Sequence, residues 1–495
     1  MMQFTHTAPP PPPLHPSSSN NGLGLGLFHD VGAAGGASSA ASLRAPWSFV
    51  VPPPPSSSSS NKISLGVGNL NSTGCMEQLL VHCANAIEAN DATMTQQILW
   101  VLNNIAPPDG DSTQRLTAAF LCGLVTRASR TGACKAAAMA AVAAAAVVEP
   151  ASLRARRFTP VELAGFVDLT PWHRFGYAAA NAAIVEACEG FPVVHVVELG
   201  TTHCMQIPTL IDMLATRPEG PPILRLTVAD LQASSGAAGN TAPPPALDVS
   251  YDELGARLVG FARSRNVAMD FRVVPASPAD AFANLMDQLR LQQQMTMVSE
   301  GVVSSSSSEA LVVNCHMLLH AVPDETAGTV VMTTAQHHQQ PVSMRSVLLK
   351  SIRALGPALV VVAEEDADFT AADVAARLRA AFNFMWIPYD AADTFLPKGS
   401  EQRRWYEAEV GWKVENVVAA EGVERVERQE DRARWGHRMR GAGFRAVAFS
   451  EEAAGEVKAM LNEHAAGWGM KREEDDLVLT WKGHNVVFAS AWTPL

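Results

Sequence analysis

Residues 191–204, with the sequence FPVVHVVELGTTHC, constrain the fold of this chain more than any other stretch. Its closely spaced valines, ended by Glu198 and Gly200, are typical of a short strand that is buried on both faces of a parallel sheet. In open α/β sheets, ligands and partners are met beyond the carboxyl ends of the strands. The turn after Glu198 is therefore expected to lie at the edge of the sheet where ligands or partners bind.

An alternation of strands and helices continues after this turn. The turn itself predicts a helix that is capped by Thr201 or Thr202 and has apolar residues at helical spacing. Further strands are predicted at 223–229, 267–274, 311–315 and 358–363, and helices at 250–264, 279–294 and 343–355. This order implies right-handed crossovers and a mostly parallel sheet. Polar insertions at 304–308 and 333–340 are expected to be surface loops.

Residues 75–148 predict an all-helical subdomain before the sheet. Apolar side chains recur there at intervals of three and four residues, as in amphipathic helices. Such a stripe is usually core, but a helical cap with a surplus apolar face is also suited to pairing with another protein. The candidate partner contacts are Leu79, Leu80, Ile87, Leu99 and Leu102.

The segment before these helices, residues 1–70, repeats proline, serine and glycine and is predicted to be a disordered tail. It lacks the apolar segment of a secretory signal. Seven cysteines without a C-x-x-C pair favour a reducing compartment. The most apolar stretch, 136–148, has about 13 residues, fewer than the roughly 20 that cross a bilayer, so no membrane span is expected.

The net charge of the chain limits the kinds of molecule that it can bind. A net charge of −12 gives no global positive field that would attract nucleic acid. Direct DNA contact therefore requires a local basic cluster. The candidates for nucleic-acid contact are Arg154, Arg156 and Arg157, with an ordinary solvated loop as the alternative.

The residue types at the strand ends limit the chemistry that can occur there. Glu198 and Asp230 end neighbouring strands, where a nucleoside is held in dinucleotide-binding folds. The loop after Glu198 offers Gly200 alone, without the series of glycines that a phosphate requires. No cofactor, metal or catalytic residue is therefore predicted, and Glu198, Gly200, Asp230 and Glu364 remain as candidate pocket residues. Cys204 is expected to be buried by packing, because no set of metal ligands accompanies it.

The C-terminal part is predicted to be helical and charged and to end in a β-hairpin. Residues 421–440 mix both signs closely, which favours a solvated helix with surface ion pairs. Residues 477–481 and 486–491 flank a turn and form the predicted hairpin. Trp481 and Trp492 are expected to be structural anchors, since burial of large aromatic side chains against a sheet is their common role.

Taken in order, several motifs resemble the plant GRAS family of transcriptional regulators, close to its SCARECROW-like members. A leucine-rich region occupies 79–124, and the VHIID core appears as HVVEL, with Glu198 in place of the usual aspartate. The PFYRE region corresponds loosely to the span from Phe382 onward. The terminal SAW motif is Ser490–Trp492. The resemblance runs from about Cys75 to the C-terminus.

The resemblance implies an α/β fold in which an N-terminal helical cap, with its connection, covers 71–190. A Rossmann-like, methyltransferase-like core with a C-terminal SAW hairpin then covers 191–495. It further implies a non-enzymatic nuclear regulator of plant development or signalling, which assembles through the cap with other transcription factors or other GRAS proteins. Homo- or heterodimers, and DNA contact made directly or through partners, stay open. The alternative is a methyltransferase-like enzyme that binds a small molecule.

Overall fold

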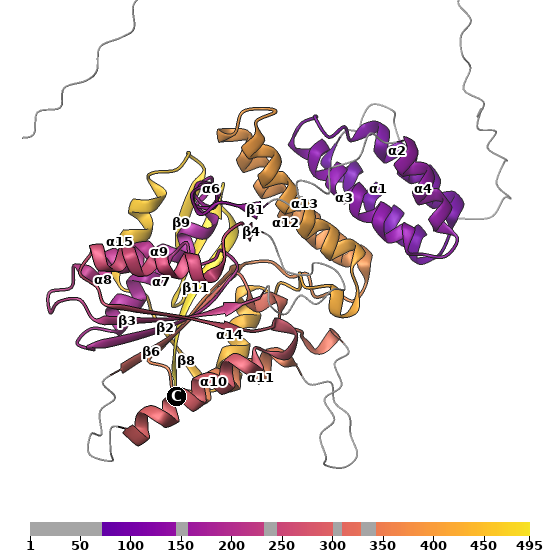
Figure 1. The fold of residues 1–495 in the computed structure, drawn as a ribbon. Coiled ribbons are helices and arrows are strands. Elements are labelled where there is room, and N and C mark those ends of the chain that lie inside the picture. Colours follow the sequence, from indigo (N-terminus) through magenta and orange to yellow (C-terminus); the bar gives the residue numbers. More distant parts are fainter. Residues whose placement is uncertain (1–71, 145–156, 232–244, 300–308, 328–342) are drawn as a thin grey trace, which may run out of the picture. The chain divides into compact units, whose positions relative to one another are not determined.

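The computed structural model of this chain describes residues 72–144, 157–231, 245–299, 309–327 and 343–495. The predicted tail at 1–70 and the predicted loops at 304–308 and 333–340 lie outside these ranges. Figure 1 shows how the described elements are arranged. Within these ranges, no helix is long and apolar enough to cross a membrane.

A mixed, largely parallel sheet forms the centre of the α/β part. Its strand order is β5-β3-β2-β6-β7-β11-β10-β9, and β8 pairs with β11. The five parallel strands are β2 (Val193–Gly200), β3 (Ile223–Asp230), β5 (Met269–Pro275), β6 (Glu309–His316) and β7 (Leu359–Glu365). The antiparallel strands are β8 (Phe444–Val447), β9 (Trp468–Glu473), β10 (Asp476–Trp481) and β11 (His484–Pro494). All five predicted parallel strands and the hairpin are confirmed.

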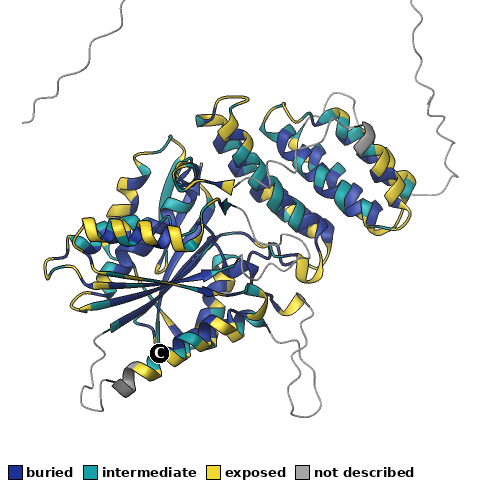
Figure 2. Cartoon of the chain, viewed as in Figure 1, coloured by how far each residue is buried: buried dark blue, intermediate teal, exposed yellow. Residues whose placement is uncertain are grey.

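Helices cover both faces of this sheet. One face packs on α7 (Pro171–Ala187), α8 (Ile207–Ala215), α9 (Tyr251–Ser264) and α15 (Glu451–Leu461). The other packs on α10 (Ala283–Ser299), α11 (Met344–Ala354) and α14 (Arg432–Gly441). A separate two-stranded sheet pairs β1 (Arg157–Phe158) with β4 (Ala246–Leu247), and a short helix, α6 (Pro160–Val167), follows β1. The strands β2, β3, β6, β7, β10 and β11 are buried along most of their length, and the centre of the sheet is dark blue in Figure 2.

The helical part has contributions from two distant parts of the chain. The predicted N-terminal helices are confirmed as α1 (Thr73–Glu88), α2 (Ala92–Ile105), α3 (Ser112–Ser129) and α4 (Cys134–Ala144). α12 (Val374–Phe395) and α13 (Glu401–Ala419) pack against them, and Figure 1 shows the orange and indigo helices side by side. Phe120 and Phe382 meet edge to face at 5.4 Å within this bundle. Residues 374–419, predicted as part of the core, therefore join the helical cap.

Two buried tryptophans anchor the C-terminal hairpin, as predicted. Trp481 is fully buried, and its Nε1 donates to Asp390 of α12 at 2.7 Å. Trp492 is 2% exposed, and its Nε1 donates to Ser490 at 2.8 Å. Because each indole is both buried and hydrogen-bonded, these residues act as anchors.

The edge strand β9 was not predicted from the sequence. Its residues Lys471, Arg472 and Glu473 are charged, and its side chains are only partly buried. An exposed edge strand with charged side chains lacks the apolar alternation by which strands are recognised.

Candidate functional site

The carboxyl ends of β2, β6 and β7, which we call the central edge, hold a chain of buried polar side chains. Asn314 of β6 donates from Nδ2 to Glu198 at 2.7 Å and to Gln206 at 2.9 Å. Gln206 in turn donates to Asn181 of α7 at 2.8 Å. Burial raises the pKa of Glu198 to about 7, and the Asn314 hydrogen bond opposes that rise. Glu198 is thus held inside the protein rather than in an open pocket.

The turn after β2 is shaped around this carboxylate. A β-carbon at Gly200 would lie 2.5 Å from Oε1 of Glu198, so glycine leaves room for the acid. The predicted cap by Thr201 or Thr202 is wrong: α8 begins at Ile207, after a turn that includes two left-handed residues, His203 and Cys204. Thr202 instead accepts a hydrogen bond from Tyr177.

Helix α7 fills the space in front of the central edge. Nδ1 of His173 lies 3.1 Å from Nε2 of His316, and the Tyr177 ring lies against the His316 ring with 4.7 Å between the ring centroids. The approach is close because Gly176 has no side chain there; a β-carbon would lie 2.7 Å from His316. Burial lowers the pKa of His173 to about 3 and that of His316 well below its usual value, so both rings are neutral.

A small cavity lies at the β7 end of the central edge. A cavity of about 40 Å³ is bordered by Trp172, His173 and Lys413 among others. Ligand pockets typically have roughly 300–1,000 Å³. The Trp172 indole and the Lys413 ammonium both bind Glu365 at the end of β7. These groups satisfy one another, and the cavity is too small for a cofactor.

Glu364 is also used internally. Its Oε1 accepts from the backbone N–H groups of Leu318 and Leu319 at 2.9 and 2.6 Å, and its Oε2 meets His320 at 2.7 Å. Burial alone would lower the pKa of His320, but Glu364 and Glu427 raise it to about 10. Glu364 therefore neutralises a buried imidazolium and is not among the residues that border the small cavity.

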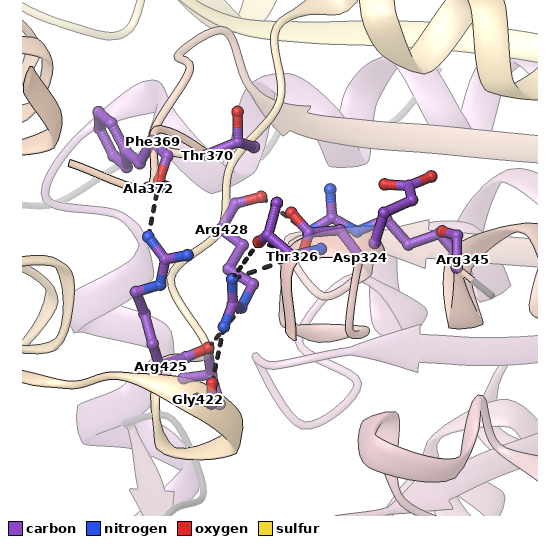
Figure 3. A network of polar contacts seen from close by, with 12 residues as sticks. Asp324, Thr326, Arg345, Phe369, Thr370, Ala372, Gly422, Arg425 and Arg428 are labelled. Atoms are coloured by element: carbon purple, nitrogen blue, oxygen red, sulfur yellow. Dashed lines mark hydrogen bonds and ion pairs between the residues drawn. The ribbon is translucent and has the colours of Figure 1, made fainter. Parts of the chain in front are cut away.

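Residues 425–430 form a buried ionic network that sequence reasoning missed (Figure 3). The guanidinium of Arg428 donates to Thr326 and to the carbonyl of Gly422 at 2.7 Å each, and lies 3.4 Å from Asp324. Arg345 of α11 donates to the carbonyl of Arg428 at 2.7 Å. The predicted solvated helix at 421–440 is thus wrong in its first half, where five of the six residues 425–430, all except Val426, are almost fully buried.

A second cavity, which we call the outer cavity, lies at the carboxyl ends of β3 and β5. It measures about 310 Å³. Its lining residues are His203, Asp230, Leu247, Val249, Ser250, Tyr251, Asp252 and Val273. Of the four candidate pocket residues, Asp230 alone borders it. The structure therefore does not bring Glu198, Gly200, Asp230 and Glu364 together around one pocket.

The candidate partner contacts in the helical part are mostly core. Leu80, Ile87, Leu99 and Leu102 are at most 1% exposed, and Leu79 is partly buried against the same cluster. The prediction that they form a free apolar face is wrong, because α3 and α12 pack on it. Among the described residues of these helices, the exposed large apolar side chains are Met94, Trp100 and Met139.

Of the three arginines predicted to contact nucleic acid, two lie outside the described residues, Arg154 and Arg156. Arg157 begins β1 and is exposed. It donates from Nη1 to the carbonyl of Leu247 at 3.1 Å, so part of its donor capacity is used within the protein. Cys204 is buried, as predicted, and burial raises its pKa well above the usual value.

Comparison with known proteins gives one consistent family. Residues 76–493 match the GRAS domain family. The chain is 52% identical to Scarecrow-like protein 32 of Arabidopsis thaliana over 434 residues, which cover 87% of this chain and 95% of that protein. It is 28% identical over 414 residues to Scarecrow-like transcription factor PAT1 of the same plant, covering 83% of this chain and 75% of that protein.

A solved structure has the same fold. The crystal structure of SCL7 in Oryza sativa superposes with a TM-score of 0.60 and 22% identity, covering 84% of this chain and all but 1% of that chain. The family match spans the helical part, the sheet and the terminal hairpin in one continuous range. This chain therefore belongs to the GRAS domain family.

Proposed function

We propose that this chain is a nuclear regulator of plant transcription that works by assembly with other proteins and not by catalysis. Its family membership supports the regulatory role, as does its similarity to a relative that is named a transcription factor. One observation carries the non-enzymatic part of the proposal. At the central edge, His173 and Tyr177 of α7 lie against His316 at the end of β6, and the cavity that the described residues form beside Glu365 at the end of β7 measures about 40 Å³.

The sheet order supports a Rossmann-like, methyltransferase-like origin for the core. Five parallel strands are followed in the sheet by the antiparallel β11, which lies between β7 and β10. Fold does not determine activity, however. A methyltransferase-like enzyme requires a site where cofactor and acceptor meet, whereas Glu198 and Glu364 are committed to internal hydrogen bonds. The assembly function is therefore preferred.

Partner contact is proposed for the helical part, on side chains other than the buried leucines. Met94 and Trp100 of α2 are 47% and 65% exposed, and Met139 of α4 is 61% exposed. Exposed tryptophan and methionine are enriched where proteins meet. Direct DNA contact stays open beside recruitment through such partners.

A tethering experiment tests the proposal. The full chain, fused to a heterologous DNA-binding domain, is expected to change the output of a reporter in plant nuclei. The unfused chain, tagged with a fluorescent protein, is expected in the nucleus. The matched controls are the DNA-binding domain alone and a Trp100→Asp variant, which should reduce the reporter response without lowering the melting temperature. A cytosolic chain that leaves the reporter unchanged when tethered would refute the proposal.

A salt titration against random duplex DNA separates the two modes of recruitment. Binding that weakens steeply with salt and enriches a sequence would indicate direct recognition. Absence of binding at low salt would assign DNA recognition to partners.

A further inference from the structure

The outer surface of α11 and α14 carries positive charge that the proposed contacts in the helical part do not use. The two helices lie side by side: Arg345 of α11 lies over the Trp435 ring of α14 at 5.1 Å, and Arg353, near the end of α11, donates to the carbonyl of Gly443 at 2.9 Å. Figure 1 shows both helices on the same side of the sheet. Neither helix contains aspartate or glutamate. Their cations can therefore be neutralised only by acids from other elements.

Acids from other elements neutralise one end of this layer. Near the start of α14, Arg434 pairs with Asp368, and Arg438 pairs with Glu325 and Glu430. Toward the ends of both helices, the basic side chains have no carboxylate partner among the described residues. These four side chains, which we call the basic face, are Lys350, Arg353, His437 and Arg440.

The spacing of these side chains brings them together. Lys350 and Arg353 are three residues apart on α11, and His437 and Arg440 are three residues apart on α14, so each pair shares one side of its helix. The N–H of Gly443 donates to the carbonyl of Arg440 at 3.0 Å, and the carbonyl of the same glycine accepts from Arg353. The ends of the two helices are thus joined, and their unpaired cations lie on neighbouring surfaces.

Exposed apolar side chains adjoin the basic face. Val347 lies one turn before Lys350 and is 36% exposed, and Leu495 is 73% exposed. Leu495 is held near the ends of both helices, because its carbonyl accepts from Arg353 at 2.8 Å and its N–H donates to Gly443 at 2.9 Å. Nucleic-acid backbones are bound mainly through cations and polar groups. Cations that alternate with apolar side chains match a peptide with both acidic and apolar residues.

The segments of this chain outside the described ranges do not supply such a peptide. They contain three acidic residues, Asp30, Glu149 and Glu300, each in a different segment. An acidic run that pairs with the basic face is therefore expected from another molecule. Charge complementarity of this kind guides association and selects partners.

We propose that the basic face binds an acidic, amphipathic segment of a partner protein, in which acidic and apolar residues alternate. Its carboxylates contact Lys350, Arg353 and Arg440, and its apolar side chains contact Val347 and Leu495. Such alternation is typical of disordered activation segments, which suits a regulator that assembles with other regulators. This inference rests on the proposed assembly function and adds a second surface and a partner chemistry to it.

Fluorescence anisotropy of the full chain with a labelled synthetic peptide, in which glutamate and leucine alternate, tests this inference. The peptide is expected to bind more weakly as salt is added, because salt screens exposed charges. Replacement of its glutamates by glutamine, or of its leucines by serine, is expected to weaken binding at least about 10-fold.

Charge reversal on the basic face should oppose binding. The double variant Lys350→Glu/Arg440→Glu places like charges opposite the peptide and is expected to weaken its binding at least about 10-fold. Arg440 also lies over the Trp492 ring at 5.9 Å, so its loss could affect the fold. Lys350→Glu alone changes an exposed side chain without a described partner and is expected to weaken binding at an unchanged melting temperature.

Arg445→Glu is the matched control. Arg445 is exposed, but along β8 it alternates with Phe444 and Ala446, which pack against the cluster beneath α11 and α14. Its side chain therefore points to the opposite face of the sheet, and the variant should bind the peptide as the original chain does.

The proposal is overturned if the peptide does not bind at millimolar concentration in low salt, or if both basic-face variants bind it like the original chain. It is also overturned if duplex DNA binds the basic face more tightly than the peptide. Self-association of the chain that Lys350→Glu abolishes would overturn it too, by assigning the surface to a second copy. The assay contains only the purified chain and the probe, so its failure is distinguishable from failure of the tethering experiment.

Discussion

The central edge and the outer cavity lie at strand ends of the same sheet, yet they differ in almost every physical respect. At the central edge, Glu198 and Glu364 are buried, hydrogen-bonded and covered by other elements. At the outer cavity, Asp230 borders a space several times larger, about 310 Å³ against 40 Å³. The acids at the strand ends therefore have different roles although their positions along the strands are similar.

The cause of this difference is helix α7. Gly176 allows the helix to lie close to β6 and β7, so that His173 and Tyr177 reach the strand ends. β3 and β5 are farther from it in the strand order. The carboxyl edge of the sheet thus becomes part of the core where α7 covers it, whereas a cavity lies at the ends of β3 and β5, beside the first residues of α9.

The largest expected effect concerns the ionic network next to the central edge. Arg345→Met removes a buried guanidinium that pairs with Glu430 at 3.1 Å and donates to two carbonyls besides that of Arg428. Loss of one partner of a buried pair costs about 3–5 kcal/mol. We expect a decrease of this size in the free energy of unfolding, measured by denaturant titration. Lys350→Met, on the exposed face of the same helix, should change it by less than about 0.5 kcal/mol.

The second prediction concerns the pH dependence of the central edge. The folded-state pKa of Glu198 is raised to about 7, so its contribution to stability is complete below the unfolded pKa, near 4.5, and is lost as the pH rises through 7. Glu198→Gln cannot ionise and should become more stable than the original chain above pH 7, by up to about 3 kcal/mol. Equal pH profiles of both proteins, from thermal melts between pH 5 and 9, would show that Glu198 is not buried as described.

A smaller effect is expected where α7 meets the turn. Tyr177→Phe removes the hydroxyl that donates to Thr202 and leaves the ring in place. A buried hydrogen bond contributes about 0.5–1.5 kcal/mol. The free energy of unfolding should fall by about 1 kcal/mol, and no change would indicate that α7 does not cover the central edge in solution.

The smallest effect is expected at the outer cavity. Asp252 is exposed in the first turn of α9, where a carboxylate interacts favourably with the helix dipole. Asp252→Asn should therefore lower the free energy of unfolding by less than about 1 kcal/mol. A loss of unfolding free energy as large as that expected for Arg345→Met would contradict the difference between an open outer cavity and a closed central edge.

Periodicity was enough to predict most of the fold. Valine runs located β2 and β7, and the spacing of Ile207, Leu210 and Leu214 located α8, because burial of these side chains follows the period of each element. The same pattern could not distinguish a core stripe from a binding face in the helical part. Leu80 and Leu99 are buried by α12 or α3, whose contact with α1 and α2 is set by tertiary packing.

The candidate site was harder to predict than the fold. Asp230 was found from its place at a strand end, but the role of His203 and Tyr251 depends on a contact between residues 48 apart in the chain. Arg425 and Glu427 look like solvated charges in the sequence, since a run of mixed signs carries no information about burial. Buried ionic networks depend on partners such as Asp324, about a hundred residues away.

The central claim, regulation by assembly without catalysis, is tested most directly by the reporter output of the tethered Glu198→Gln chain. A catalytic carboxylate at the central edge would lose its ability to transfer a proton, whereas the fold is expected to persist because glutamine still accepts from Asn314. The account predicts reporter output within about twofold of the original chain and a melting temperature at least as high. Loss of output at an unchanged melting temperature would contradict it and indicate chemistry at Glu198.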